Sequence, residues 1–418
     1  MSNRITRDLL KFIENSPSCF HVVEGQRQIY LAAGFTELME QEEWQLESGG
    51  KYFTTRNGSA CIAFAIPRGS SRGFHFVASH SDSPSFKVKE NPEMEIEGHY
   101  VKLNTEKYGG PILSTWMDRP LSVAGRVSVL QGEKIVTKLV NVDKDLLIIP
   151  SVAPHLGGTA SEYNPQVDLL PLYAGKKGTF IKYLAKAAEV EEKEILSYDL
   201  FLYVREKGRI LGAAGEFVVS PKLDDLQCAY ASILAMSESE PTEYINVCAV
   251  FDNEEVGSGT KQGAGSTFLE DVLARICEAL NISRAGYHRM IAESFMISAD
   301  NAHAVHPNHP EKSDPTNRPY LNGGIVLKYH GSQRYATDAI SAGILKHLCH
   351  LAGVPCQTYT NRSDIAGGST LGNISTGHVS VNTVDIGLPQ LAMHSALETA
   401  GVQDTEYAVK MMKVFYGQ

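Results

Sequence analysis

Several apolar segments of this chain stop abruptly at polar clusters, and this pattern constrains the fold most strongly. Residues 73–79 (GFHFVAS) form a strand-like run that ends in His-Ser-Asp at residues 80–82. Pro84 follows and cannot continue a hydrogen-bonded ladder, so the polar side chains lie at a strand end. Residues 244–251 (YINVCAVF) and 295–299 (FMISA) end in the same way. Such clusters are typical of α/β proteins, in which ligands bind at the carboxyl ends of parallel strands.

Five clusters of this kind occur along the chain. They are His80-Ser81-Asp82, Asp224-Asp225, Asp252-Asn253-Glu254-Glu255, Asp300-Asn301-Ala302-His303 and His394. Together they offer imidazole and carboxylate ligands without a thiolate, a donor set that suits zinc, manganese or cobalt. A carboxylate such as Asp300, which ends an apolar strand, needs a partner or a metal because burying an unpaired charge is unfavourable.

Taken one at a time, most of these clusters have ordinary explanations. The pair Asp224-Asp225 would cap a helix that begins near Leu226. Glu254-Glu255 would form a solvated turn, and His394 would be a hydrogen-bonded core histidine. It is the occurrence of all five clusters in one chain that favours a shared site.

Strands and helices alternate toward both ends of the chain. Residues 60–66 and 325–329 are further strand-like runs, and residues 267–280 place apolar side chains at helical spacing. This alternation predicts an α/β domain with a mixed, mostly parallel sheet flanked by helices. Residues 92–220 differ, with short alternating strands, a Gly/Pro-rich stretch and a charged helix. We therefore expect residues 1–91 and 221–418 to form one domain, interrupted by an inserted β-rich domain at 92–220.

Charge and composition exclude several partners. The 418 residues include 38 Lys and Arg against 48 Asp and Glu, a formal net charge of −10. Such a chain is a poor candidate for binding nucleic acid or an anionic membrane, and we predict neither partner. No apolar run approaches the roughly 20 residues that span a bilayer. The charged N-terminus is unlike a signal peptide, and seven cysteines without a CxxC pair suggest reduced thiols, so we expect a cytoplasmic protein.

Two glycine-rich stretches point to other chemistries, but neither completes its motif. Residues 257–265 follow a strand and precede a helix, yet Gln262 stands where a dinucleotide fingerprint requires glycine, and no GxxxxGK[ST] sequence occurs. Residues 69–73 (GSSRG) match GxSxG. A nucleophile elbow needs a helix after the serine, whereas a strand follows here, so we interpret this stretch as a hairpin turn.

Six segments give the chain a resemblance to the M18 metallopeptidases, the aspartyl aminopeptidase family. They are ASHSDSPSFKVK (78–89), SPKLDDL (220–226), FDNEEVGS (251–258), SADNAHAVHPN (298–308), LKYHGSQRYATDA (327–339) and AMHSALE (392–398). The resemblance implies a metalloaminopeptidase with two divalent metal ions per subunit, zinc foremost and manganese or cobalt as alternatives. It assigns His80 and Asp300 to one metal, Glu255 and His394 to the other, and Asp224 to both.

The resemblance also implies roles for other residues around the metals. Glu254 would act as the general base, and Asp82 would fix the tautomer of His80. His303 and Tyr335 would hold the scissile carbonyl and its oxyanion.

Two further positions would determine which substrates are accepted. Lys328 would line the pocket for the N-terminal side chain and favour Asp or Glu there, although a solvated lysine at a strand end is the alternative interpretation. His155, within IPSVAPHLGG, would reach into the active site of a neighbouring subunit.

The resemblance finally implies peptide substrates and self-association into a homo-oligomer, a dodecamer of dimers. Two other functions use the same metal site: a broad or neutral-residue aminopeptidase, and a related di-zinc deacylase. A non-catalytic assembly subunit is a third possibility, but it would be expected to have lost Glu254 or a metal ligand, and the sequence retains all of them.

Overall fold

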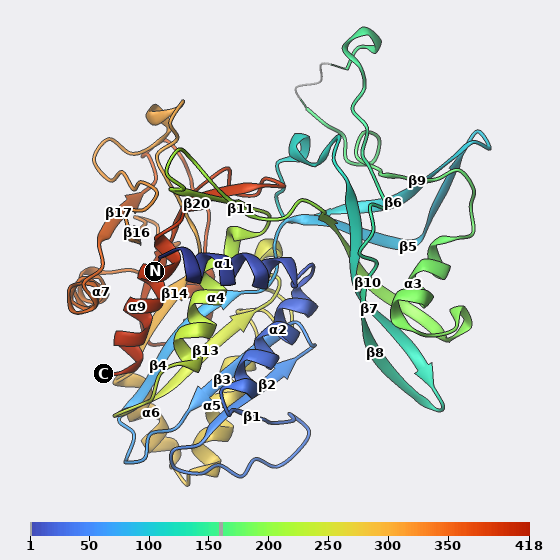
Figure 1. Ribbon diagram of the computed structural model, residues 1–418. Helices are drawn as coiled ribbons and strands as arrows, with labels where there is room; N and C mark the ends of the chain where they lie inside the picture. The colour runs from blue at the N-terminus through green and yellow to red at the C-terminus, as the bar shows by residue number, and fades with distance from the viewer. Residues whose placement is uncertain (1, 159–161) are drawn as a thin grey trace.

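The computed structural model describes residues 2–158 and 162–418 and is built around a nine-stranded sheet (Figure 1). Five of its eight neighbouring strand pairs are parallel, which confirms the predicted mixed, mostly parallel sheet. In spatial order its strands are β1 (Thr36–Glu37), β2 (Lys51–Arg56), β3 (Ala60–Ala65), β13 (Tyr244–Phe251), β4 (Gly73–His80), β14 (Phe295–Ala299), β18 (Asn382–Gly387), β16 (Ile325–Tyr329) and β17 (Cys356–Thr360).

The centre of this sheet is apolar on both faces. Every residue of β4 and β14 is buried, and so is every residue of β13 after Tyr244. Successive residues of a strand point to opposite faces, so Val247 and Ala249 join one apolar cluster while Cys248 and Val250 join the other. Helices on both sides are therefore needed to cover the sheet, as expected for parallel strands.

Two groups of helices cover the two faces (Figure 1). Each group packs its apolar side chains onto one of the two clusters. One group consists of α1 (Ser2–Glu14), α2 (Cys19–Ala32), α4 (Leu223–Ser237), α7 (Ala339–Ala352) and α9 (Asp404–Tyr416), and the other of α5 (Phe268–Ala279), α6 (Arg284–Ala292) and α8 (Leu371–Ser375).

A second, six-stranded sheet is antiparallel throughout and lies beside the first (Figure 1). It surrounds its own apolar cluster, to which helix α3 (Phe180–Ala188) contributes. In spatial order its strands are β8 (Lys134–Asn141), β7 (Leu121–Gln131), β10 (Ile195–Val204), β5 (Ser85–Ile96), β6 (Tyr100–Tyr108) and β9 (Leu172–Ala174).

A third, five-stranded sheet joins segments that are distant in the sequence. In it β12 pairs with β20, so residues just after the six-stranded sheet return to the C-terminal part of the chain. Its strands are β11 (Arg209–Leu211), β12 (Phe217–Ser220), β20 (Glu398–Gly401), β19 (Pro389–Leu391) and β15 (Ala302–His303). Short 3-10 helices are η1 (Leu113–Trp116), η2 (Pro154–Leu156), η3 (Glu192–Glu194), η4 (Glu254–Val256) and η5 (Pro310–Lys312).

The division into domains at residues 92 and 220 stays a prediction. The six-stranded sheet itself uses residues 85–204, and the segment 205–220 pairs with β20. The six-stranded sheet also contacts the turn between β2 and β3 and helix α2 through one side chain. The Arg126 guanidinium of β7 donates hydrogen bonds to the backbone and side-chain oxygens of Asn57, lies 2.9 Å from Asp199 Oδ2, and stacks 4.3 Å from the Phe20 ring.

The hairpin interpretation of residues 69–73 is wrong. Strands β3 and β4 on either side of this turn are not neighbours, because β13 lies between them. The turn is therefore a connection across the end of β13. The sequence shows that a reversal occurs here but does not show that a distant strand is inserted into it.

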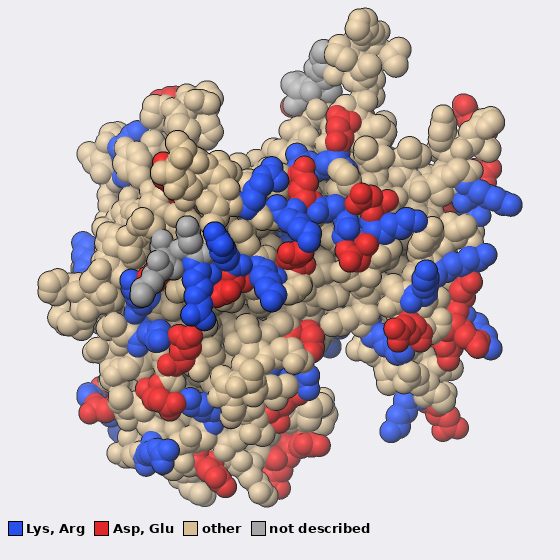
Figure 2. Space-filling view, viewed as in Figure 1, with Lys and Arg blue, Asp and Glu red and all other residues tan. Residues whose placement is uncertain are grey.

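Charged side chains of both signs lie beside one another on the face shown in Figure 2. Among the described residues, no helix is both long enough and apolar enough to cross a membrane.

The fold predicts a pH-dependent stability that arises from His75. Its ring is stacked between Tyr244 and Phe415 at centroid distances of 3.8 and 4.3 Å, and burial lowers the pKa of His75 to about 4. Between pH 6.5 and 4 the unfolded chain binds this proton and the folded chain does not, so stability falls as the pH falls. His75→Phe should reduce this loss by up to about 3 kcal/mol.

Urea unfolding at pH 4.5 and pH 7 measures this effect. Burial also lowers the pKa of His21 to about 4, so the variant keeps the part of the pH dependence that arises from His21. His99→Phe, at an exposed position, is the matched control. An equal pH dependence in His75→Phe and the wild type would contradict the assignment.

Candidate metal centre

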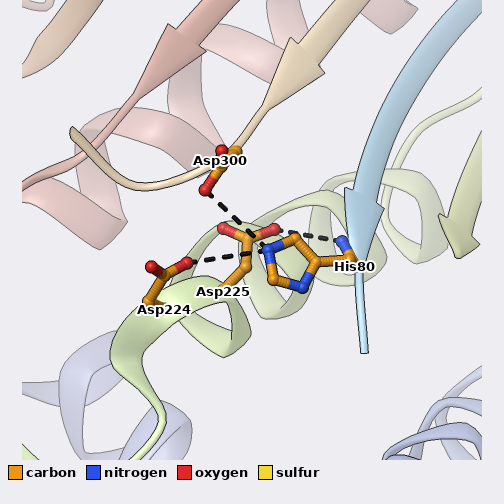
Figure 3. A group of neighbouring side chains, drawn as sticks. All are labelled: His80, Asp224, Asp225 and Asp300. Atoms are coloured by element: carbon orange, nitrogen blue, oxygen red, sulfur yellow. Dashed lines mark hydrogen bonds and ion pairs between the residues drawn. The ribbon is translucent and has the colours of Figure 1, made fainter. Parts of the chain in front are cut away.

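The first group of predicted ligands lies where β4 and β14 end. His80 is the last residue of β4, Asp300 directly follows β14, and Asp224 lies near the start of α4. His80 Nε2 is 3.6 Å from Asp224 Oδ1 and 3.8 Å from Asp300 Oδ1. Figure 3 shows these side chains turned toward one another, with Asp225 beside them. All four residues are buried.

A second group shares Asp224 with the first. Asp224 Oδ2 is 3.5 Å from His394 Nε2, which is in turn 3.5 Å from Glu255 Oε2. The two oxygens of one carboxylate therefore face two different histidines, His80 and His394. The structure thus brings together all five residues that the sequence predicted as ligands.

The donor atoms fit a divalent metal. Ligand atoms at about 2.0–2.2 Å from a tetrahedral zinc lie about 3.3–3.6 Å apart, close to the spacings found here. Asp224 Oδ1 is buried and has no hydrogen-bond partner, which is unfavourable unless a cation satisfies it. The clustering of Asp224, Glu255 and Asp300 around two imidazoles is explained in the same way.

Backbone carbonyls orient both histidines. His80 Nδ1 lies 3.1 Å from the carbonyl oxygen of Asp82 and 3.3 Å from its Oδ1. His394 Nδ1 lies 3.1 Å from the carbonyl oxygen of Gly110. An Nδ1–H that donates to a carbonyl leaves Nε2 as the free lone pair. Each Nε2 faces the carboxylates, so both histidines are prepared to bind a metal.

Asp82 also organises the turn that carries Glu254 and Glu255. Its Oδ1 accepts a hydrogen bond from the Glu254 N–H at 3.1 Å, and its Oδ2 accepts one from the Glu255 N–H at 3.2 Å. Asn253, with φ of 61°, turns the chain in the left-handed region before η4. Both adjacent carboxylates therefore reach the same site, each with an oxygen within 4.8 Å of a His80 nitrogen.

The electrostatics of the site are dominated by buried carboxylates. Burial raises the pKa of Glu254 to about 8, and the charges of Asp300 and Asp82 add to the effect. Burial and the charge of Asp224 likewise raise the pKa of Glu255. Burial alone would lower the pKa of His394, but the Asp224 carboxylate beside its Nε2 raises the pKa to about 9, so a metal at Nε2 would displace a proton. A bound cation would relieve this concentration of negative charge.

Three acidic or aromatic residues that support the site were not predicted. Asp225 Oδ2 accepts a hydrogen bond from the His80 N–H at 3.1 Å, so Asp225 supports β4 and does not cap α4. Glu398 accepts hydrogen bonds from the backbone N–H groups of His394 and Asp224 at 2.6 and 3.0 Å. Tyr108 donates its hydroxyl hydrogen to Asp82 Oδ2 at 2.7 Å. Asp225 and Glu398 lie inside segments already singled out, whereas nothing in the sequence marks Tyr108.

Lys328 is buried rather than solvated. Only 2% of the residue is exposed, and its ammonium lies 3.4 Å from Asp300 Oδ2 and 5.5 Å from the centroid of the Tyr335 ring. The interpretation of Lys328 as a solvated lysine is therefore wrong. Tyr335 is buried as well, and it lies beside the Lys328 ammonium that pairs with Asp300.

His303 lies in the wall of a cavity, whereas His155 lies in a short 3-10 helix. His303 ends β15, is exposed, and lines a cavity of about 610 Å³ whose wall also includes Tyr359 and Gln390. His155 lies in η2, is exposed, and belongs to none of the clusters that could hold a metal ion among the described residues.

Comparison with known proteins gives one family. Residues 12–416 match the family described as "Aminopeptidase I zinc metalloprotease (M18)". A Clostridium novyi protein named "Probable M18 family aminopeptidase 2" is 48% identical, with all of both chains covered.

Solved structures agree with this match. The structure described as the Ape4 and Nbr1 complex has a TM-score of 0.95 at 34% identity, over 99% of this chain and 86% of that one. The S. cerevisiae mApe1 dodecamer has a TM-score of 0.89 at 27% identity, over 99% and 96%.

Proposed function

Because this chain belongs to the M18 family of zinc metalloprotease aminopeptidases, we propose that it removes the N-terminal residue of peptides at a centre of two divalent metal ions. One observation carries the proposal of two ions. The oxygens of Asp224 face His80 on one side and His394 on the other, and each histidine has a further carboxylate beside it, Asp300 or Glu255. A single ion would leave one of these groups without a cation.

In this proposal His80 and Asp300 would hold one ion, Glu255 and His394 would hold the other, and Asp224 would be shared by both. When bound, zinc or a similar ion supplies Lewis-acid chemistry, which polarises a peptide carbonyl and activates water. The three carboxylates balance three of the four positive charges. The remaining positive charge favours the transition state, in which negative charge develops on the carbonyl oxygen.

Glu254 is the proposed general base. Its carboxylate accepts a proton from the attacking water and delivers it to the leaving amine. Burial supports this role because it raises the pKa of Glu254 above that of a free carboxyl group, and a carboxylate with a higher pKa accepts a proton more readily. Asp82 accepts a hydrogen bond from the Glu254 N–H and thereby holds the backbone of the turn that carries this carboxylate.

Glu254→Gln tests the role of the base. The amide keeps the shape of the side chain but accepts no proton, so kcat should fall by about 10²–10⁴-fold. The zinc content, measured by mass spectrometry, should equal that of the wild type. Glu255→Gln is the comparison, and it should lose zinc as well as activity. A Glu254→Gln variant that binds zinc normally and cleaves at the wild-type rate would contradict the mechanism.

His303, Tyr335 and Lys328 are the proposed substrate-binding residues. His303 and Tyr335 would hold the scissile carbonyl and its oxyanion. Lys328 is buried next to the site, and its ammonium carries three donors. The ion pair with Asp300 leaves donors available for a substrate carboxylate. This arrangement supports a preference for an acidic N-terminal residue.

A panel of Asp-, Glu-, Leu- and Lys-p-nitroanilides measures this preference as kcat/KM. We expect Asp and Glu to exceed Leu by about tenfold or more, because a desolvated charge pair contributes more than 1.4 kcal/mol. Lys should be cleaved most slowly since its charge repels Lys328. Faster cleavage of Leu than of Asp would refute the acidic preference and identify a neutral aminopeptidase with the same metal chemistry.

We also propose that the chain forms a dodecamer in the cytoplasm, in which His155 enters the active site of a neighbouring subunit. A solved relative with 27% identity is itself a dodecamer. In this chain η2 is fully exposed, and the apolar side chains of Val152 and Leu156 beside His155 are 52% and 80% exposed. Exposed apolar groups of this kind favour an interface.

Light scattering tests the assembly. We expect a mass of about twelve times the 45.7 kDa chain, because the burial of these apolar side chains favours association. Replacing Leu156 with Asp should lower the mass, whereas replacing Leu139, an exposed leucine on β8, serves as the control. A wild-type mass of one chain would contradict the proposal.

A further inference from the structure

Residues 108–112 follow the six-stranded sheet and contact the candidate metal centre at the end of the nine-stranded sheet. Tyr108 is the last residue of β6. Its hydroxyl donates to Asp82 Oδ2 at 2.7 Å and accepts a hydrogen bond from Asn253 Nδ2 at 2.9 Å. The ring itself packs against Phe201 of β10, with centroids 5.2 Å apart. One side chain of the second sheet thus holds both Asp82 and the turn before Glu254.

The next residues of this segment contact the ligands themselves. Gly109 has φ of 69°, and a Cβ at this position would lie 3.1 Å from Glu255 Cβ and 3.3 Å from Glu255 Oε2. The Gly110 carbonyl accepts from His394 Nδ1, and the Ile112 N–H donates to the His394 carbonyl at 2.9 Å. Gly109 is thus required both for the left-handed backbone and for the close approach of Glu255.

The two halves of the metal centre are supported differently. His80 is 1% exposed and lies within β4, where Asp82 and Asp225 of the same domain hold it. The His394 side chain is 32% exposed and lies in a turn with φ of 68°. Its Nδ1 contact and its backbone carbonyl contact both come from the 108–112 segment.

We propose that the 108–112 segment is a positioning element for the Glu255–His394 half of the metal centre. The inference rests on the proposed dinuclear site. It adds that the segment after the six-stranded sheet holds the ligands of one half in position. Glu255 and His394 come from turns, which need an external contact to hold a ligand geometry. The His80–Asp300 half is built on strand ends, and among the described residues the segment reaches it indirectly, through the hydrogen bond of Tyr108 to Asp82, which contacts His80 Nδ1.

Two variants, each of which lacks one histidine, allow zinc binding by each half of the proposed metal centre to be measured separately. In His80→Ala the Glu255–His394 half keeps its full set of Asp224, Glu255 and His394, and only Asp300 remains of the other half. In His394→Ala the other half keeps His80, Asp224 and Asp300, and Glu255 is left without its histidine. Zinc titration of the metal-free protein by calorimetry measures each remaining step without reference to activity. Gly109→Ala should weaken zinc binding about 10–100-fold in the first background, as is typical when the support of a ligand is lost, and less than about twofold in the second.

Two controls separate positioning from general damage. Gly98 also has a positive φ, of 74°, but a Cβ there meets nothing within 4 Å, so Gly98→Ala carries the backbone strain alone. Tyr108→Phe is the second variant, for use if Gly109→Ala does not fold. Because Asp82 contacts both the Glu255 N–H and His80 Nδ1, this variant should weaken zinc binding in both backgrounds, and more in His80→Ala than in His394→Ala. Tyr100→Phe, at the exposed opposite end of β6, should not.

The outcomes distinguish this inference from the proposed function. A wild-type protein that binds one zinc ion would refute the dinuclear site. If the wild type binds two ions, unchanged binding by Gly109→Ala and Tyr108→Phe in the His80→Ala background would overturn the inference alone. Equal weakening in both backgrounds would overturn it as well, since that result indicates a general loss of structure.

Discussion

The parallel alignment of β4, β13 and β14 is the constraint on which the metal centre depends. The ladder places Phe251 opposite His80 and Ser298 opposite Ala78, so the three strands end at one edge of the sheet. The polar residues that follow each strand then lie close together, because the carboxyl ends of parallel strands are at the same edge of the sheet. Helix α4 packs on the same strands and brings Asp224 to the same edge.

Acidic side chains have two different roles at this edge of the sheet. Asp224, Glu255 and Asp300 face the imidazoles, where a divalent ion would offset their mutual repulsion. Asp82, Asp225 and Glu398 instead accept hydrogen bonds from backbone N–H groups of the segments that carry those ligands. Asp82 and Glu398 each accept two backbone N–H groups and so hold in place the turns from which the predicted ligands extend.

Much of the fold and of the ligand set could be predicted because both depend on local sequence. Apolar runs predicted the central strands, and the polar clusters that follow them predicted a shared site. The choice of His80, Glu255 and Asp300 as ligands came from the family resemblance and stays a prediction. The insertion of β13 between β3 and β4 could not be predicted, because pairing of distant strands leaves no local signal. For the same reason the ion pair of Lys328 with Asp300 was missed. Tyr108, in an ordinary antiparallel strand, had nothing to distinguish it.

The sequence by itself determined the chemical inventory: two histidines and three carboxylates at the ends of buried segments, next to a glutamate that can act as a base. The tertiary structure decided how these groups are shared and supported. Only in the folded chain does Asp224 face both histidines, and only there does the second sheet hold His394 through Gly110. The reason is physical, since residue type and spacing set which bonds a side chain can make, whereas contacts across hundreds of residues depend on how the sheets pack.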